Sequence, residues 1–133
     1  MKITQREDFG LLFMSVLARR YKQGYTSVAI VAKETNLSML FLRHIVAVLL
    51  KSKLIKSREG LQGGYRLTKS PKDVSIAEIM SAMSGKLVVP HCSYGDCRIK
   101  GKKCILPHFW GKIDKKILSY LSAISLSTFA KTS

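Results

Sequence analysis

Apolar positions recur at spacings of three and four residues in several stretches of this chain, which predicts a mainly helical protein. The first stretch covers residues 5–22 and ends before Gly24. Its apolar face consists of Phe9, Leu12, Phe13, Val16 and Leu17. A later helix is predicted from 76 to 83, between a capping box formed by Ser75 and Glu78 and a closing Gly85.

The last predicted helix covers residues 105–126 and has an apolar seam along one side. The seam consists of Leu106, Trp110, Ile113, Ile117, Tyr120 or Leu121, and Ile124. Such a seam is typical of a helix that packs on another helix. The partner helix belongs either to the same domain or to a second copy of the chain.

Two shorter helices are predicted between residues 26 and 50. Ser27 is suited to cap the first, Thr35 and Asn36 end it, and Ser38 is suited to cap the second. The apolar positions of the second helix are Leu42, Ile45, Val46 and Leu49. Two short helices joined by a turn of three or four residues form the frame of a helix-turn-helix.

A β-hairpin is predicted directly after these helices. Residues 54–58 and 65–67 have the composition of strands, and the connecting residues 59–64 include three glycines. This order of elements predicts a winged helix-turn-helix, in which the hairpin is the wing. The alternative is a small α+β core in which the two helices merely pack together.

The charge of the chain favours a polyanionic partner. The 23 basic and 8 acidic residues give a net charge of +15, and both halves of the chain share the excess. No long apolar run or signal-peptide pattern is present, so we expect a soluble cytoplasmic protein without a membrane segment. No nucleophile–base pair, paired carboxylates or phosphate-cradling loop stands out, so we do not expect an enzyme.

Candidate DNA contacts follow from the winged-helix interpretation. Arg43 can bind guanine bidentately, Ser38 can donate to a phosphate, and glycines allow backbone to approach DNA closely. The candidates on the second helix are Ser38, Met39, Leu40, Phe41, Arg43 and His44. Those on the wing are Lys56, Arg58, Gly63, Gly64 and Arg66.

Residues 86–104 lack helical or strand periodicity and contain all three cysteines, Cys92, Cys97 and Cys104, in a C-x4-C-x6-C pattern. Thiolates are soft ligands that suit an iron–sulfur cluster or zinc, and either group normally takes a fourth ligand. The candidate fourth ligands are His91, Asp96 and His108 nearby, and Glu7 and Asp8 farther away. The spacing does not decide between cluster and zinc, and reduced thiols without a ligand are a further alternative.

Together these motifs resemble the Rrf-two family of bacterial regulators, which includes IscR-like and NsrR-like members. The markers are the opening Met-Lys-Ile-Thr, Leu37-Ser38 with Leu42, Gly63-Gly64-Tyr65, residues 76–80 and the three cysteines. The resemblance implies a winged-helix homodimer on palindromic double-stranded DNA, with a 2Fe–2S or 4Fe–4S cluster on the cysteines. It divides the chain into a DNA-binding domain (1–85), a cluster-binding loop (86–104), and a dimerisation helix with a C-terminal tail (105–133).

The chain departs from both kinds of member at the fourth ligand. IscR-like members have a ligand histidine three residues after the last cysteine, where this chain has Pro107 followed by His108. NsrR-like members can use an acidic residue of the other subunit at the position of Asp8. We therefore expect Asp8 as the fourth ligand, with His108 and His91 as alternatives.

The function that the resemblance implies is transcriptional regulation, and we expect repression. DNA affinity would be controlled by a cluster that senses nitric oxide, redox state or cluster supply. A zinc-bound or thiol-switched winged-helix regulator without a cluster is the alternative.

Overall fold

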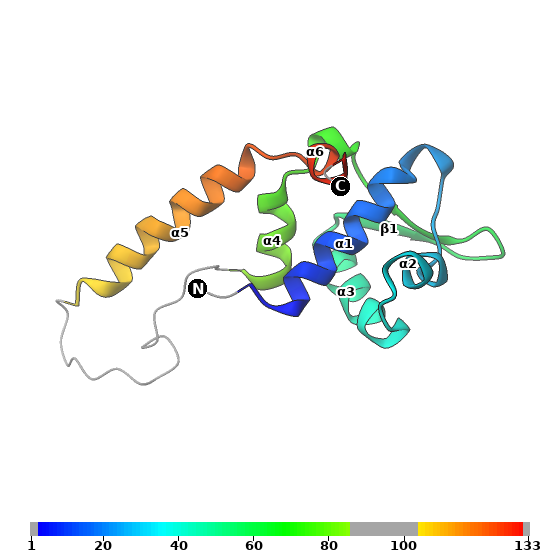
Figure 1. Cartoon of the computed structure of the whole chain (residues 1–133), viewed down its shortest axis with the longest axis horizontal. Helices are drawn as coiled ribbons and strands as arrows, with labels where there is room; N and C mark the ends of the chain where they lie inside the picture. Colours follow the sequence, from blue (N-terminus) through cyan, green and yellow to red (C-terminus); the bar gives the residue numbers. More distant parts are fainter. Residues whose placement is uncertain (1–2, 86–103, 132–133) are drawn as a thin grey trace.

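The computed structural model describes residues 3–85 and 104–131, which form a helical protein with one small antiparallel hairpin, as predicted (Figure 1). In chain order the elements are α1 (Gln5–Arg19), η1 (Tyr21–Gln23), α2 (Val28–Thr35), α3 (Met39–Lys51), β1 (Ile55–Arg58), β2 (Gly64–Leu67), η2 (Pro71–Asp73), α4 (Ile76–Ser84), α5 (Leu106–Ser122) and α6 (Leu126–Lys131). None of the described helices is both long and apolar enough to cross a membrane.

The helix starts that the sequence predicts are confirmed by their capping hydrogen bonds. The hydroxyls of Ser27 and Ser38 accept backbone N–H groups at 3.3 and 3.2 Å, and so begin α2 and α3. At α4, Glu78 accepts the backbone N–H of Ser75 at 2.8 Å and the Ser75 hydroxyl accepts the Glu78 N–H at 3.1 Å, which completes a capping box.

The hydrophobic core lies around α1, which packs against α4, α6, α2 and α3. Each fully buried large apolar side chain contributes roughly 1.5–3 kcal/mol relative to an exposed one. The apolar face predicted for α3 is buried throughout, so α3 is fixed in rotation about its own axis. The buried apolar residues of these elements include Phe13, Met14, Val16, Leu17, Val31, Leu42, Ile45, Val46, Leu49, Ile76, Ile79, Met80, Met83 and Leu126.

Two predicted helix ends are wrong. The first helix ends at Arg19 and is followed by the short helix η1, although the sequence predicted it to continue to residue 22. The predicted helix 105–126 ends at Ser122, because the chain turns there to pair with the segment before α4. Ile76 N–H donates to the Ile124 carbonyl at 2.9 Å and Leu126 N–H donates to the Val74 carbonyl at 2.7 Å.

The segment after this turn is helix α6 and not a tail. Leu126 is completely buried, and α6 packs against α1 and η2. Leu126 therefore belongs to the same core as α1. Ile124 continues the three–four spacing of α5 in the sequence, but it lies after the end of that helix.

Candidate nucleic-acid interface

The helix-turn-helix is formed by α2, a tight turn and α3. Asn36 ends α2 in the left-handed conformation, at φ 59° and ψ 27°, and its N–H donates to the Ala32 carbonyl at 2.8 Å. Asparagine tolerates this conformation better than most residues, so the turn is encoded locally. Val31 of α2 and Leu42 of α3 are buried and hold the motif against α1.

The outer face of α3 is free to meet a partner. Every residue that the sequence proposed on this helix start is exposed: Ser38, Met39, Leu40, Phe41, Arg43 and His44. Leu40 is 68% exposed, whereas Phe41 also contacts the edge of the Phe9 ring, at 5.7 Å between centroids, and so helps hold α3 to α1. The sequence analysis missed Ala47 and Lys51, which share this face with Leu40 and His44 at helical spacing and are also exposed.

The wing has a register that brings basic side chains together. Lys56 pairs with Arg66 and Arg58 pairs with Gly64, so the three cations share one face of the hairpin. The opposite face carries Ile55 and Leu67, which are buried in the core. Like charges directly opposite each other destabilise an isolated hairpin, and a polyanion on this face would relieve the repulsion.

The base of the wing is tied to the start of the helix-turn-helix by a short bridge. Thr26 N–H donates to the Tyr65 carbonyl at 2.9 Å, and Tyr65 N–H donates to the Thr26 carbonyl at 2.8 Å. The Tyr65 ring also contacts Phe13 of α1, at 6.4 Å between centroids. The bridge therefore connects the wing to the helix-turn-helix. Such a connection allows the wing and α3 to contact one duplex at the same time.

Two tyrosines support the arginines of the wing. The Arg58 guanidinium lies 5.8 Å from the centre of the Tyr25 ring, and that of Arg66 lies 4.7 Å from the centre of Tyr21. Arg66 is half-buried, and its Nε has no hydrogen-bond partner within the described part of the chain. Arg66 therefore lies back against η1, while Lys56 and Arg58 are exposed. This stacking could not be predicted from the sequence, because the partners are far apart along the chain.

The candidate metal ligands lie only partly within the described residues. Asp8 is exposed in the first turn of α1, Cys104 is a half-buried free thiol just before α5, and His108 is exposed at the start of α5. His91, Cys92, Asp96 and Cys97 lie outside the described residues. Within 3–85 and 104–131, no three His, Cys, Asp or Glu side chains gather as a metal site.

Glu7, the other acidic candidate, has a different role. It is buried and accepts the Thr4 backbone N–H at 2.7 Å and the Thr4 hydroxyl, which caps α1. Burial raises the pKa of Glu7, but the hydrogen bonds from Thr4 outweigh it and leave that pKa below its ordinary value. Of the two acidic residues, only Asp8 is free to face a ligand from solvent.

The comparisons with known proteins agree with this geometry. The Rrf2 family model, described as an iron-dependent transcriptional regulator, matches residues 3–132. An HTH-type transcriptional regulator of Azotobacter vinelandii, ORF2, is 30% identical over 129 residues, which are 96% of this chain and 77% of the relative.

Two solved structures show the same fold. IscR of T. potens is 27% identical with a TM-score of 0.76, and the match covers 98% of this chain and 87% of that one. CymR, named the global cysteine regulator of B. subtilis, is 25% identical with a TM-score of 0.80, and the match covers 100% of this chain and 98% of that one. These relatives are transcriptional regulators rather than enzymes.

Proposed function

This chain belongs to the Rrf2 family of transcriptional regulators, and we propose that it is a repressor that binds a palindromic DNA site as a homodimer. The observation that carries this proposal is the exposed face of α3 together with a basic wing whose base is bridged, through Tyr65, to Thr26 at the start of the helix-turn-helix. A recognition helix of this kind enters the major groove, while the wing follows the neighbouring backbone or minor groove.

In this proposal the residues on the two elements have different tasks. Arg43 and His44 lie on the outer face of α3, where they would address base edges in the major groove. Lys56, Arg58 and Lys51 would neutralise phosphates, and the stacking of Arg58 on Tyr25 would hold that guanidinium in place. Ser38, whose oxygen accepts the capping hydrogen bond, can still donate its hydroxyl hydrogen to a phosphate.

Replacing Arg43 and Lys56 separately tests this division. We expect Arg43→Ala to weaken the best DNA site by roughly 1–3 kcal/mol and to relax the preference at one base pair. We expect Lys56→Ala to weaken all duplexes about equally and to lower the slope of log K against log salt by about 1. Fluorescence anisotropy with selected and random duplexes at several salt concentrations measures both effects.

The matched control for this series is Lys115→Ala, since Lys115 is an exposed lysine of α5, away from the helix-turn-helix and the wing. It removes one charge and should leave the preference and the affinity almost unchanged. Equal losses for Lys56→Ala and Lys115→Ala would show that net charge alone drives binding and would contradict the proposed interface.

The proposed dimer uses the free face of α5. Figure 1 shows α5 projecting from the body, with α4 as its neighbour. Leu106 and Phe109 are exposed, and Tyr120 is 73% exposed, whereas Lys115 and Ser119 lie on the far side of the helix. A two-fold pair of such helices would bury these side chains, and two-fold symmetry matches a palindromic site. A second copy of this chain is therefore the occupant that we propose for this face.

The proposed signal is an iron–sulfur cluster, 2Fe–2S or 4Fe–4S, bound by Cys92, Cys97 and Cys104, that reports nitric oxide, redox state or cluster supply. The iron-dependent description of the family and the likeness to IscR support it. The described donors fit in type, since Cys104 is a free thiol and Asp8 is an exposed carboxylate. When bound, the cluster would supply a redox- and nitric oxide-sensitive group that ties Cys104, at the head of α5, to its other ligands.

Asp8 is the fourth ligand that we propose. In Figure 1 the first turn of α1 lies away from the start of α5. This separation favours a carboxylate donated by the α1 helix of a partner subunit over one from the same chain. A ligand from across the dimer would link the cluster to the α1 helix that supports α3 through Phe9 and Phe41. His108 and His91 are the competing ligands.

Substituting each candidate ligand tests this assignment. In anaerobically purified protein we expect Asp8→Ala to change the visible absorption and to reduce iron and sulfide content, whereas His108→Ala and His91→Ala leave them as in the wild type. Asp73→Ala is a matched control, because Asp73 is an exposed aspartate of η2. An unchanged Asp8→Ala spectrum together with an altered His108→Ala spectrum would transfer the role to His108.

A zinc-bound or thiol-switched regulator without a cluster is the second candidate function. The likeness to CymR, a regulator of cysteine by its name, favours a thiol response, and Cys104 is a free thiol in the structure. Metal and sulfide analysis distinguishes the candidates: iron with sulfide supports the cluster, zinc alone supports the zinc form, and neither supports the thiol switch.

A further inference from the structure

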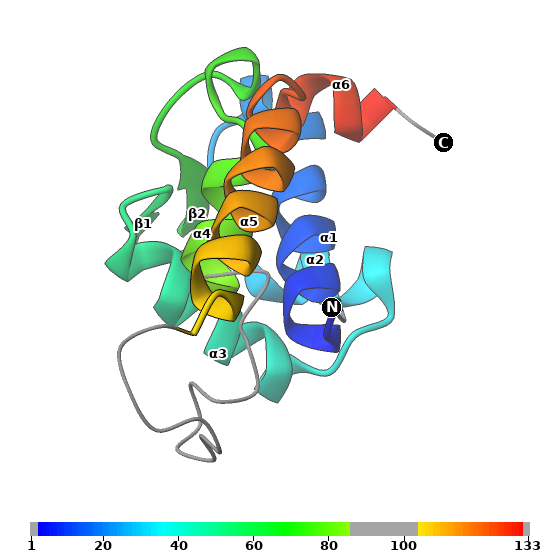
Figure 2. The same cartoon turned by 90° about the vertical axis from the view of Figure 1, so that its left-hand side faces the viewer.

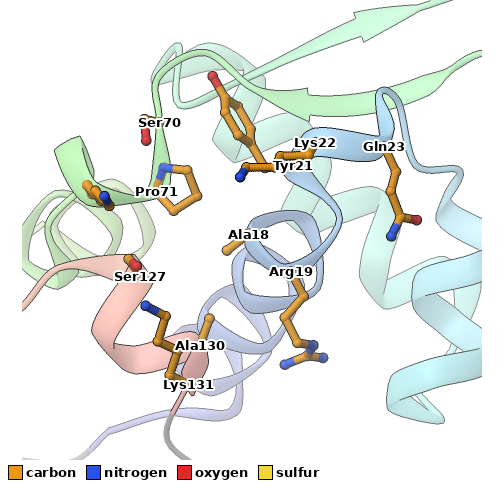
Figure 3. A pocket seen from close by; sticks show the side chains of 11 residues that line it. Ala18, Arg19, Tyr21, Lys22, Gln23, Ser70, Pro71, Ser127, Ala130 and Lys131 are labelled. Atoms are coloured by element: carbon orange, nitrogen blue, oxygen red, sulfur yellow. The ribbon is translucent and has the colours of Figure 1, made fainter.

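A basic cleft lies where the end of α1, η1, η2 and α6 meet (Figure 3). Its volume is about 730 Å³, within the range of roughly 300–1,000 Å³ that is usual for small-molecule sites. Figures 1 and 2 both show α6 and α3 on opposite sides of the body, above and below α1. The cleft is therefore apart from α3, although Tyr21 brings its edge next to the wing.

The walls of the cleft are strongly basic. Four of its eleven lining residues are Lys or Arg and none is acidic; the cations are Arg19, Lys22, Lys72 and Lys131. Arg19 is 3.9 Å from Glu34 and is partly neutralised. Within the described residues, the three lysines have no carboxylate within the 4.0 Å of a salt bridge. Gathering these charges is unfavourable by itself, and a bound anion would offset the cost.

The remaining lining groups define the class of anion. Figure 3 shows Lys22 of η1 and Lys131 of α6 separated from each other, with Ser70, Pro71 and Ser127 along the side between them. Lysine ammonium groups bind phosphate as point charges, and hydroxyls donate to its oxygens. The apolar surface of Pro71 suits the organic part of a ligand. We propose that this cleft binds a small phosphate-bearing anion between Lys22 and Lys131.

The cleft has a direct physical link to the wing. The Tyr21 side chain lines it, and the same ring carries the Arg66 guanidinium at 4.7 Å. An anion in the cleft would restrict the movement of the Tyr21 ring and attract the Arg66 guanidinium that stacks on it. The position of Arg66 on the wing would then change. This consequence rests on the proposed DNA-binding function, whereas the binding of the anion does not.

Calorimetry on the full chain without DNA tests the site, with inorganic pyrophosphate, inorganic phosphate and adenosine monophosphate as probes. We expect saturable binding of one pyrophosphate per chain, and affinity about tenfold lower in Lys22→Gln and in Lys131→Gln, as expected when one charge-assisted contact is lost. Lys115→Gln, which removes an equal charge outside the cleft, should bind as the wild type does. Tighter binding of adenosine monophosphate than of inorganic phosphate would show that the apolar wall contributes.

The absence of saturable heat at millimolar pyrophosphate would overturn the site, and so would equal losses in Lys22→Gln and Lys115→Gln. Thermal melting of each variant confirms that it is folded. DNA titrations at constant ionic strength, with and without pyrophosphate, then test the link to the wing. A change in the wild type that is absent in Lys22→Gln supports the link, and an unchanged DNA affinity overturns the link alone.

Discussion

Replacing Gly64 with alanine is expected to lower the free energy of unfolding by about 3 kcal/mol or more and to weaken DNA binding at every sequence. Gly64 has φ +148°, and an added Cβ would lie 2.5 Å from the Thr26 carbonyl carbon and 2.8 Å from the Ser27 nitrogen. Both are backbone atoms that cannot turn aside. The chain must then give up the bridge between Thr26 and Tyr65 or move the wing as a whole.

A matched glycine separates the clash from backbone strain. Gly60, at the tip of the wing, has φ +107°, but a Cβ there meets no described atom within 4 Å. We expect Gly60→Ala to cost only the strain, about 1 kcal/mol, and to leave the base of the wing in place. Urea denaturation and DNA titration of both variants measure the difference. Equal losses of stability in Gly64→Ala and Gly60→Ala would show that the clash with the Thr26 backbone does not contribute.

The sequence predicted the elements whose signals are local. Ser27, Ser38 and the pair Ser75–Glu78 begin their helices through hydrogen bonds that span three residues, so their meaning can be found in a short window of sequence. The apolar face of α3 follows from spacing alone, and Lys51 could have been added to the exposed face by the same rule. These local signals suffice for the frame of the winged helix.

The features that the sequence did not reveal depend on contacts between distant segments. The stacking of Tyr21 on Arg66 and the bridge of Thr26 to Tyr65 join residues that are far apart along the chain. The turn after Ser122 is stabilised by the burial of Leu126 in the core. The apolar spacing of α5 continues through this turn, so the sequence does not reveal where the helix ends. Glu7 and Asp8 have similar chemistry, and only the capping hydrogen bonds of Glu7 distinguish their roles.

Placing a charge on the apolar face of α5 is expected to separate the proposed dimer. Ile117 is half-buried on the apolar seam of α5 that also includes Leu106 and Ile113, and α5 packs otherwise on α4. A two-fold interface would bury two new carboxylates in Ile117→Glu, one from each copy, and each uncompensated buried charge costs several kcal/mol. We therefore expect monomers in sedimentation velocity at micromolar concentration. DNA affinity should fall by at least about 100-fold, because the second half-site is no longer linked to the first.

Ser119→Glu is the control that makes this result specific. Ser119 lies two residues away on the same helix, is exposed, and faces the side that carries the lysines. It introduces the same charge, so its dimerisation and half-site linkage should match those of the wild type. Unfolding curves establish whether Ile117→Glu keeps a folded core around α1. A folded Ile117→Glu protein that sediments as the wild type does would remove α5 from the interface, and the exposed Leu106, Phe109 and Tyr120 would then need a different partner.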